Sequence, residues 1–112
     1  MKIRRVLFGI LLLPILATLM VNLAAASNQT LSGVVTDNMC GKKHTMLPGK
    51  SDAECTRACV KMGSKYALLV GDKLYILKGD AKQFHALAGK RAAITGEVGG
   101  TNVTVASIAA GK

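Results

Sequence analysis

The chain has 112 residues, 15 of them basic and six acidic, so its formal net charge is +9. This length allows one small domain and excludes a second independent core. We expect residues 1–26 to be a removable export signal, which leaves 12 basic residues against the six acidic ones. Most of the apolar excess belongs to this signal, so the composition gives no indication of a membrane-embedded domain.

The amino terminus has the three parts of a signal peptide. A basic segment at 1–5 precedes an apolar segment at 6–21, and the alanines at 24–26 are typical of a cleavage site. The apolar segment is interrupted by Pro14 and is shorter than the roughly 20 residues that a membrane-spanning helix needs. We therefore predict one mature domain at 27–112 that is periplasmic or secreted, where disulfides persist.

The first elements of this domain are predicted from apolar runs and capping residues. Residues 31–36 form a short β-branched strand, and the polar stretch after it reads as a loop. A helix is predicted from residue 51 to about 62, because Ser51 and Glu54 have the spacing of a capping box.

Four more strands and a second helix follow. They are predicted at 66–70 and 74–77 (strands), 81–88 (a helix capped by Asp80), 90–98 and 101–108 (strands). This order is that of a small five-stranded OB-like antiparallel barrel, with one helix in the insertion after strand one and another between strands three and four. A barrel is preferred to an open sheet because Gly33 and Gly96 lie within the first and fourth strands, where a small barrel bends.

The predicted core is thin and mostly aliphatic. A chain of about 86 residues hides only about 60 to 65 per cent of its unfolded surface, so additional staples would help to stabilise it. The core candidates are Leu31, Val35, Leu68, Val70, Leu74, Ile76, Phe84, Leu87, Ile94, Val98, Val103, Val105 and Ile108.

The unusual chemistry lies in the insertion at about 37–63. Its reactive residues are Cys40, His44, Cys55 and Cys59, with the spacing Cys-x3-His-x10-Cys-x3-Cys. Residues four apart on a helix share one face, so the last two cysteines are expected to project together. The preceding loop can bring the other cysteine and the histidine to that face.

Three interpretations of these residues remain open. The first is a structural disulfide from Cys40 to Cys55 or to Cys59, which would pin the insertion to the first strand. A bridge between Cys55 and Cys59 is disfavoured because side chains that run nearly parallel along a helix would strain the bond.

The second interpretation is a metal site in which three thiolates and the His44 imidazole bind zinc or copper. Met39 and Met46 flank the loop ligands, and their thioether sulfurs would suit copper.

The third interpretation is thiol chemistry at Cys55. It falls in the first turn of its helix, where the macrodipole and the nearby Arg57 favour a thiolate, while Asp52 and Glu54 oppose it. The spacing is not Cys-x2-Cys, so a thioredoxin-type site is disfavoured.

Several segments carry a resemblance to other proteins. They are Gly33-Val-Val-Thr-Asp37-Asn-Met-Cys-Gly41, then His44, Cys55-x3-Cys59-Val60, Gly63-Ser-Lys-Tyr-Ala67, and the stretch from Ala88-Gly-Lys90 to Ile108. With these the mature chain resembles a group of short exported bacterial proteins. The resemblance implies an exported OB-like domain in which the cysteines and the histidine recur together, and it implies no activity.

Other sites offer little chemistry. No nucleophile elbow, phosphate-binding glycine loop or carboxylate pair is present, so we expect a binding protein rather than an enzyme, with thiol redox activity as the one alternative. His85 lacks partner residues in the sequence and is predicted to be a surface or partly packed histidine. Nucleic acid is disfavoured because only Tyr66, Tyr75 and Phe84 are aromatic after cleavage.

Two functions are therefore expected as alternatives. The first is an exported binding module whose Cys40, His44, Cys55 and Cys59 cluster holds a soft metal ion, zinc or copper, or acts through a thiol. The second is a disulfide-stapled scaffold whose scattered lysines contact an envelope protein or an anionic polymer.

Overall fold

A computed structural model describes residues 28–41 and 49–111, so the predicted signal at 1–26 lies outside the described residues. The described chain is mainly β, with five strands and two helices. They are β1 (Asn28–Asp37), α1 (Asp52–Lys61), β2 (Tyr66–Val70), β3 (Lys73–Lys78), α2 (Ala81–Ala86), β4 (Arg91–Gly99) and β5 (Asn102–Ala110). The predicted order of elements is confirmed. Helix α2 ends two residues earlier than predicted, with Leu87 as its C-cap.

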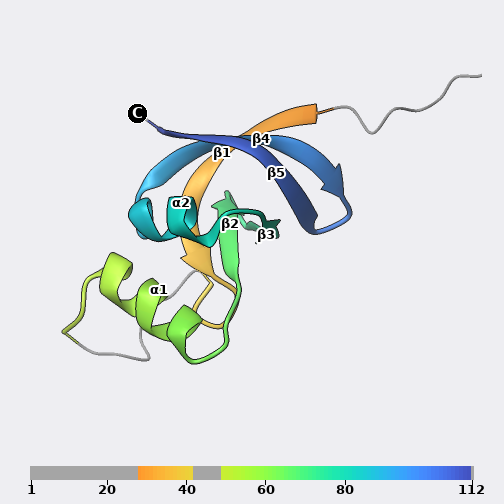
Figure 1. Cartoon of the computed structure of the whole chain (residues 1–112). Helices are drawn as coiled ribbons and strands as arrows, with labels where there is room; N and C mark the ends of the chain where they lie inside the picture. Colours follow the sequence, from red (N-terminus) through yellow and green to blue (C-terminus); the bar gives the residue numbers. More distant parts are fainter. Residues whose placement is uncertain (1–27, 42–48, 112) are drawn as a thin grey trace, which may run out of the picture.

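The strands pair in a closed ring in the order β1, β2, β3, β5 and β4, and β4 returns to pair with β1 (Figure 1). Four of the pairings are antiparallel, but β3 and β5 are parallel, so the sheet is mixed. The expectation of a wholly antiparallel set is therefore wrong for this pair. Strands joined by a tight turn must run antiparallel, whereas α2 and β4 intervene between β3 and β5 and let the chain re-enter in the same direction.

Two glycines lie where neighbouring strands come too close for a side chain. A Cβ on Gly33 would be 2.3 Å from the Leu69 carbonyl oxygen, and a Cβ on Gly96 would be 2.2 Å from the Thr104 carbonyl oxygen. The β4–β5 register also shifts between Thr95 and Gly96, an irregularity of the kind that bends a strand. Glycine is therefore required at both positions by the close approach of the backbones.

The main core combines residues from the strands and α2. Its buried members are Val35, Tyr66, Leu68, Leu77, Phe84, Ala88, Ala92, Ile94 and Val103. Most of the other predicted core residues pack against it while partly buried, but Leu74 and Ile76 are outside this cluster. Tyr66 was not predicted as core, and its ring contacts that of Phe84 edge to face, with 5.8 Å between centroids.

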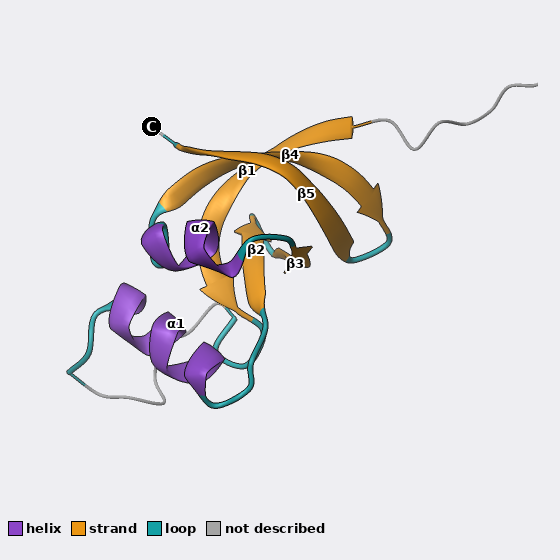
Figure 2. Ribbon diagram, viewed as in Figure 1, coloured by secondary structure: helices purple, strands orange, loops and turns teal. Residues whose placement is uncertain are grey.

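The two helices lie close together on one side of the ring. Helix α1 packs near the carboxyl end of β1, and α2 lies between α1 and the upper strands (Figure 2). None of the helices among the described residues has the length and apolar character needed to cross a membrane. This arrangement brings the end of β1 against α1, which is where the cysteines lie.

Candidate metal centre

Cys40 is held in a short turn directly after β1. The Asp37 carboxylate accepts hydrogen bonds from the backbone N–H groups of Met39 and Cys40, both at 2.9 Å. The Gly41 N–H donates to the Asp37 carbonyl at 2.9 Å and closes the turn. An aspartate that bonds the amides two and three residues ahead fixes the local backbone. The sulfur of Cys40 therefore has a defined starting position at the end of the strand.

Ser64 joins this turn to the carboxyl end of α1. Its hydroxyl lies 3.0 Å from Asp37 Oδ2 and 2.6 Å from Asn38 Oδ1, and its N–H donates to the Cys59 carbonyl at 3.0 Å. The Lys65 N–H also donates to Asn38 Oδ1, at 2.9 Å. These contacts tie the two cysteine-bearing segments together without involving the sulfur atoms.

Helix α1 supplies the other two cysteines. The Glu54 N–H donates to Ser51 Oγ at 3.2 Å, and the Ser51 N–H donates to Glu54 Oε2 at 3.1 Å, so the predicted capping box is confirmed. Cys55 and Cys59 lie on one face of the helix, as predicted, and both are fully buried. The cap thus fixes where the helix begins, and the spacing of four places both thiols toward Cys40.

The three sulfur atoms form one buried cluster. Cys40 Sγ lies 3.5 Å from Cys55 Sγ and 2.9 Å from Cys59 Sγ, and all three sulfurs lie within 4.8 Å of one another. A tetrahedral zinc ion with Zn–S bonds of about 2.3 Å separates its sulfurs by about 3.8 Å. Both separations from Cys40 Sγ are shorter than this value, by about 0.3 and 0.9 Å, so side-chain adjustments on the order of 1 Å would let the three cysteines hold a metal ion.

No cysteine pair is bonded in this structure. All three thiols are free, and the shortest separation, between Cys40 and Cys59, exceeds the roughly 2.05 Å of a disulfide. The predicted disulfide from Cys40 to Cys55 or Cys59 is therefore not observed. The geometry nevertheless places Cys40 Sγ within 3.5 Å of the sulfurs of both predicted partners.

Burial controls the protonation of the cluster. Burial raises the pKa of the Cys40 thiol well above its usual range, and hydrogen bonds to Cys59 and Cys55 and the nearby Asp37 carboxylate raise it further. Burial also raises the pKa of Cys59, although its hydrogen bond with Cys40 acts in the opposite direction. Without a metal these two thiols remain protonated at neutral pH, so a metal ion must displace their protons in order to bind.

The fourth predicted ligand, His44, lies outside the described residues, as does Met46. Its approach to the sulfurs therefore stays a prediction. Met39 is described and its side chain is 52% exposed, so it is not buried with the three sulfurs.

Sequence reasoning missed the residues that support the cluster. Asp37 and Ser64 are buried, and the only signal for them was the short spacing from an aspartate at a strand end to a cysteine. Asp37 Oδ1 and Thr56 Oγ1 are also buried and have no hydrogen-bond partner among the described residues. A buried carboxylate oxygen without a partner costs folding free energy. On this side of the cluster, Asp37 Oδ1 can therefore still accept a hydrogen bond.

His85 lies apart from the cysteines, as predicted. It is exposed on α2, and its Nδ1 lies 3.2 Å from the Tyr66 hydroxyl oxygen. It is not among the clustered metal-ligating side chains of the described residues.

Comparisons with protein-family models, with curated proteins and with solved structures find no match for this chain.

Proposed function

We propose that this chain is an exported binding protein that holds one soft metal ion through Cys40, Cys55 and Cys59. The observation that carries the proposal is that three buried sulfurs from two separate segments lie within 4.8 Å of one another. Thiolates are the ligands that zinc and copper(I) prefer in proteins. Three converging thiols in a small domain therefore fit a metal centre better than a packing role alone.

The ligand count distinguishes the two metals. Copper(I) accepts a site made of three sulfurs, whereas structural zinc requires four ligands. For zinc, the predicted fourth ligand is His44, which follows Cys40 closely in the sequence. The proposal covers both metals, and the effect of a His44→Ala substitution separates them: zinc affinity falls and copper(I) affinity is retained.

The proposed context is the periplasm or the extracellular space, from the signal-like segment at 1–26. The proposed scaffold is an OB-like barrel. Its support is the closed strand order together with the position of α2 between the third and fourth strands. In such a scaffold the segment between β1 and β2 is an insertion, and the proposed metal clamps that insertion to the end of β1.

The test is titration of the reduced full chain with Co²⁺ and Cd²⁺, in which binding is monitored through the thiolate-to-metal charge-transfer absorption. We expect one ion per chain, and a loss of at least about 100-fold in affinity for each of Cys40→Ser, Cys55→Ser and Cys59→Ser, since even residues that only support metal ligands contribute 10- to 100-fold. Ala58→Ser, which adds a hydroxyl to the same helix, is the matched control and should bind normally. Absence of the charge-transfer band would refute the proposal.

The second candidate function is a disulfide-stapled scaffold that contacts an envelope protein or an anionic polymer. It is favoured by the 2.9 Å separation of Cys40 Sγ and Cys59 Sγ, which needs to shorten by only about 1 Å to reach bonding distance. Thiol and metal content in protein purified from an oxidising compartment distinguishes the candidates. One free thiol without metal supports the scaffold, and three reduced cysteines with one ion support the metal centre.

A further inference from the structure

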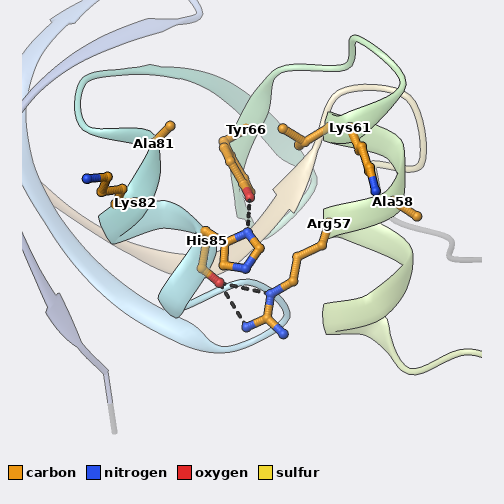
Figure 3. A pocket seen from close by; sticks show the side chains of 8 residues that line it. Arg57, Ala58, Lys61, Tyr66, Ala81, Lys82 and His85 are labelled. Carbon is orange, nitrogen blue, oxygen red and sulfur yellow. Dashed lines mark hydrogen bonds between the residues drawn. The ribbon is translucent and has the colours of Figure 1, made fainter.

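A pocket of about 550 Å³ opens between α1 and α2. Figure 3 shows side chains of the two helices on either side of it, with Tyr66 between them. The lining residues are Arg57, Ala58, Val60, Lys61, Tyr66, Ala81, Lys82 and His85. On α1, at about 100° per residue, residues 57 and 61 lie about 120° to 160° around the helix axis from the two cysteines, and neither cysteine lines the pocket. The pocket is therefore separate from the proposed metal centre.

Hydrogen bonds fix the shape of this pocket. Arg57 donates from Nε and Nη2 to the His85 carbonyl at 3.0 and 2.9 Å, which joins α1 to α2 (Figure 3). The Tyr66 hydroxyl lies 3.2 Å from His85 Nδ1, and the Tyr66 ring is anchored against Phe84 in the core. A pocket whose walls are already held in place loses little conformational freedom when a ligand binds.

The lining combines an apolar surface with residues that carry positive charge. Ala58, Val60 and Ala81 contribute apolar atoms, and the basic residues Arg57, Lys61 and Lys82 line the pocket mainly through their aliphatic carbon atoms, with their cationic groups beside it. Among the residues that the structure describes, no aspartate or glutamate takes part in the lining. Arg57 uses two of its five N–H groups on the His85 carbonyl, so three remain to donate to a ligand.

The Tyr66 phenol adds no negative charge to the pocket. Burial raises its pKa above the ordinary value, although Arg57 nearby acts in the opposite direction. The hydroxyl therefore stays neutral at physiological pH, and its hydrogen bond joins it to His85 Nδ1. The charged residues that line the pocket in the described part of the chain are therefore all basic.

We propose that this pocket binds a small organic anion with an apolar body, such as a monocarboxylate carrying an aromatic or aliphatic group. The apolar body would cover the alanine and valine surface, and the carboxylate would face the arginine and lysine cations. A free metal cation is repelled by the same charges. Single-stranded nucleic acid would need several stacking aromatics, and the described lining residues include only Tyr66 of this kind.

The test uses three probes that share one apolar body and differ in charge: 4-phenylbutyrate, 4-phenylbutanol and 4-phenylbutylamine. Binding to the full chain is followed by NMR through the ring signals of Tyr66 and His85. We expect saturable binding of the carboxylate, weaker binding of the alcohol and none of the amine. A carboxylate that fails to saturate, or an alcohol or amine that binds equally well, would overturn the proposal.

Matched variants locate the site. In Lys61→Met with Lys82→Met, we expect the affinity for 4-phenylbutyrate to fall about fivefold or more, because two favourable charge contacts are lost. Lys50→Met with Lys90→Met also removes two positive charges, from exposed residues outside the pocket, and should bind normally. Equal losses in both proteins would indicate a general charge effect and overturn the proposal. Metal binding at the cysteines should be unchanged throughout, so failure here is distinguishable from failure of the metal proposal.

Discussion

At the scale of single residues, the Asp37 carboxylate is the acceptor on which several hydrogen bonds of the Cys40 turn converge. One of its oxygens accepts from two backbone N–H groups and lies 3.0 Å from the Ser64 hydroxyl oxygen, while the side chain is fully buried. Removing it leaves the Cys40 N–H without its acceptor and leaves the Met39 N–H only its longer contact with Ser64 Oγ, at 3.3 Å. Buried groups that lose their partners each cost about 1 to 3 kcal/mol.

We therefore predict that Asp37→Ala lowers the free energy of unfolding by about 2 to 4 kcal/mol, measured by urea denaturation. Asp37→Asn keeps an acceptor oxygen of the same shape and should lose less than half as much. The same Asp37→Ala protein should also bind metal more weakly, because the Cys40 turn is no longer fixed. Equal stability of the alanine variant and the unmodified chain would show that the carboxylate does not hold this turn.

The thiols give the metal-free chain a defined pH dependence. Folding raises the pKa of Cys40 and Cys59 above the ordinary 9.0, so the unfolded chain ionises first as pH rises. Above about pH 9 the unfolded state binds fewer protons than the folded state, so the free energy of unfolding falls with increasing pH. The stabilisation is fully present below pH 9 and is lost as the pH rises toward the folded-state pKa.

We predict that urea denaturation of the reduced, metal-free chain shows falling stability above about pH 9. Each thiol that stays protonated only in the folded state contributes a slope of about 1.4 kcal/mol per pH unit. The pKa of Tyr66 is also raised from its ordinary value of 10.0, so Tyr66 lowers stability in the same direction at higher pH. The contribution of the thiol is therefore isolated by comparison with Cys59→Ser, which keeps Tyr66. The slope should be shallower in that variant, and an identical slope would contradict the assignment to the thiol.

At the scale of elements, the glycines in β1 and β4 determine how closely the strands of the ring approach. A Cβ on Gly96 would lie 2.2 Å from a backbone oxygen of β5, whereas a Cβ on Gly99 would meet nothing within 4 Å. Both residues belong to β4, so they form a matched pair. Backbone contacts of this kind cannot be relieved by rotating a side chain.

Gly96→Ala is therefore expected to cost about 3 kcal/mol or more, since overpacking typically costs 1 to 3 kcal/mol when side chains can still adjust. Gly99→Ala should change stability by less than about 1 kcal/mol. Thermal unfolding of both variants measures the difference. Similar losses in the two proteins would mean that close approach is not the reason for glycine at position 96.

The sequence was sufficient for elements whose signals are local. The capping box at Ser51 and Glu54 predicted the start of α1, and β-branched and apolar runs bounded by turn residues predicted all five strands. The parallel pairing of β3 with β5 was missed, because strand direction in a non-sequential pair depends on the whole chain path. Local patterns carry no information about such a pairing.

The candidate site could also be predicted from the sequence only in part. The spacing of Cys55 and Cys59 on a helix placed both on one face, but the approach of Cys40 depends on Asp37 and Ser64, which are distant from each other in sequence. The pocket between α1 and α2 was missed entirely, because its residues come from two helices and a strand. A feature assembled by tertiary packing leaves no pattern in a single segment.

At the scale of the whole molecule, the cysteine cluster joins the insertion to the ring of strands. Cys40 follows β1 directly, whereas Cys55 and Cys59 lie 15 and 19 residues later. A metal held by all three would close this loop in the folded state only. Ligands that bind only the folded state stabilise it by mass action.

We predict that one equivalent of metal raises the unfolding temperature of the reduced chain. At a free metal concentration 1,000 times the Kd, the stabilisation is about 4.1 kcal/mol. Cys55→Ser should show no comparable rise, and a chelator should reverse the effect in the unmodified chain. A metal that leaves the unfolding temperature unchanged would mean that any binding occurs outside the folded cluster.

The most direct measurement is zinc-edge X-ray absorption on the reduced full chain loaded with one equivalent of Zn²⁺. We predict a first coordination shell with three sulfur atoms at about 2.3 Å. A shell composed of nitrogen and oxygen alone would contradict it, because the zinc would then lie away from Cys40, Cys55 and Cys59.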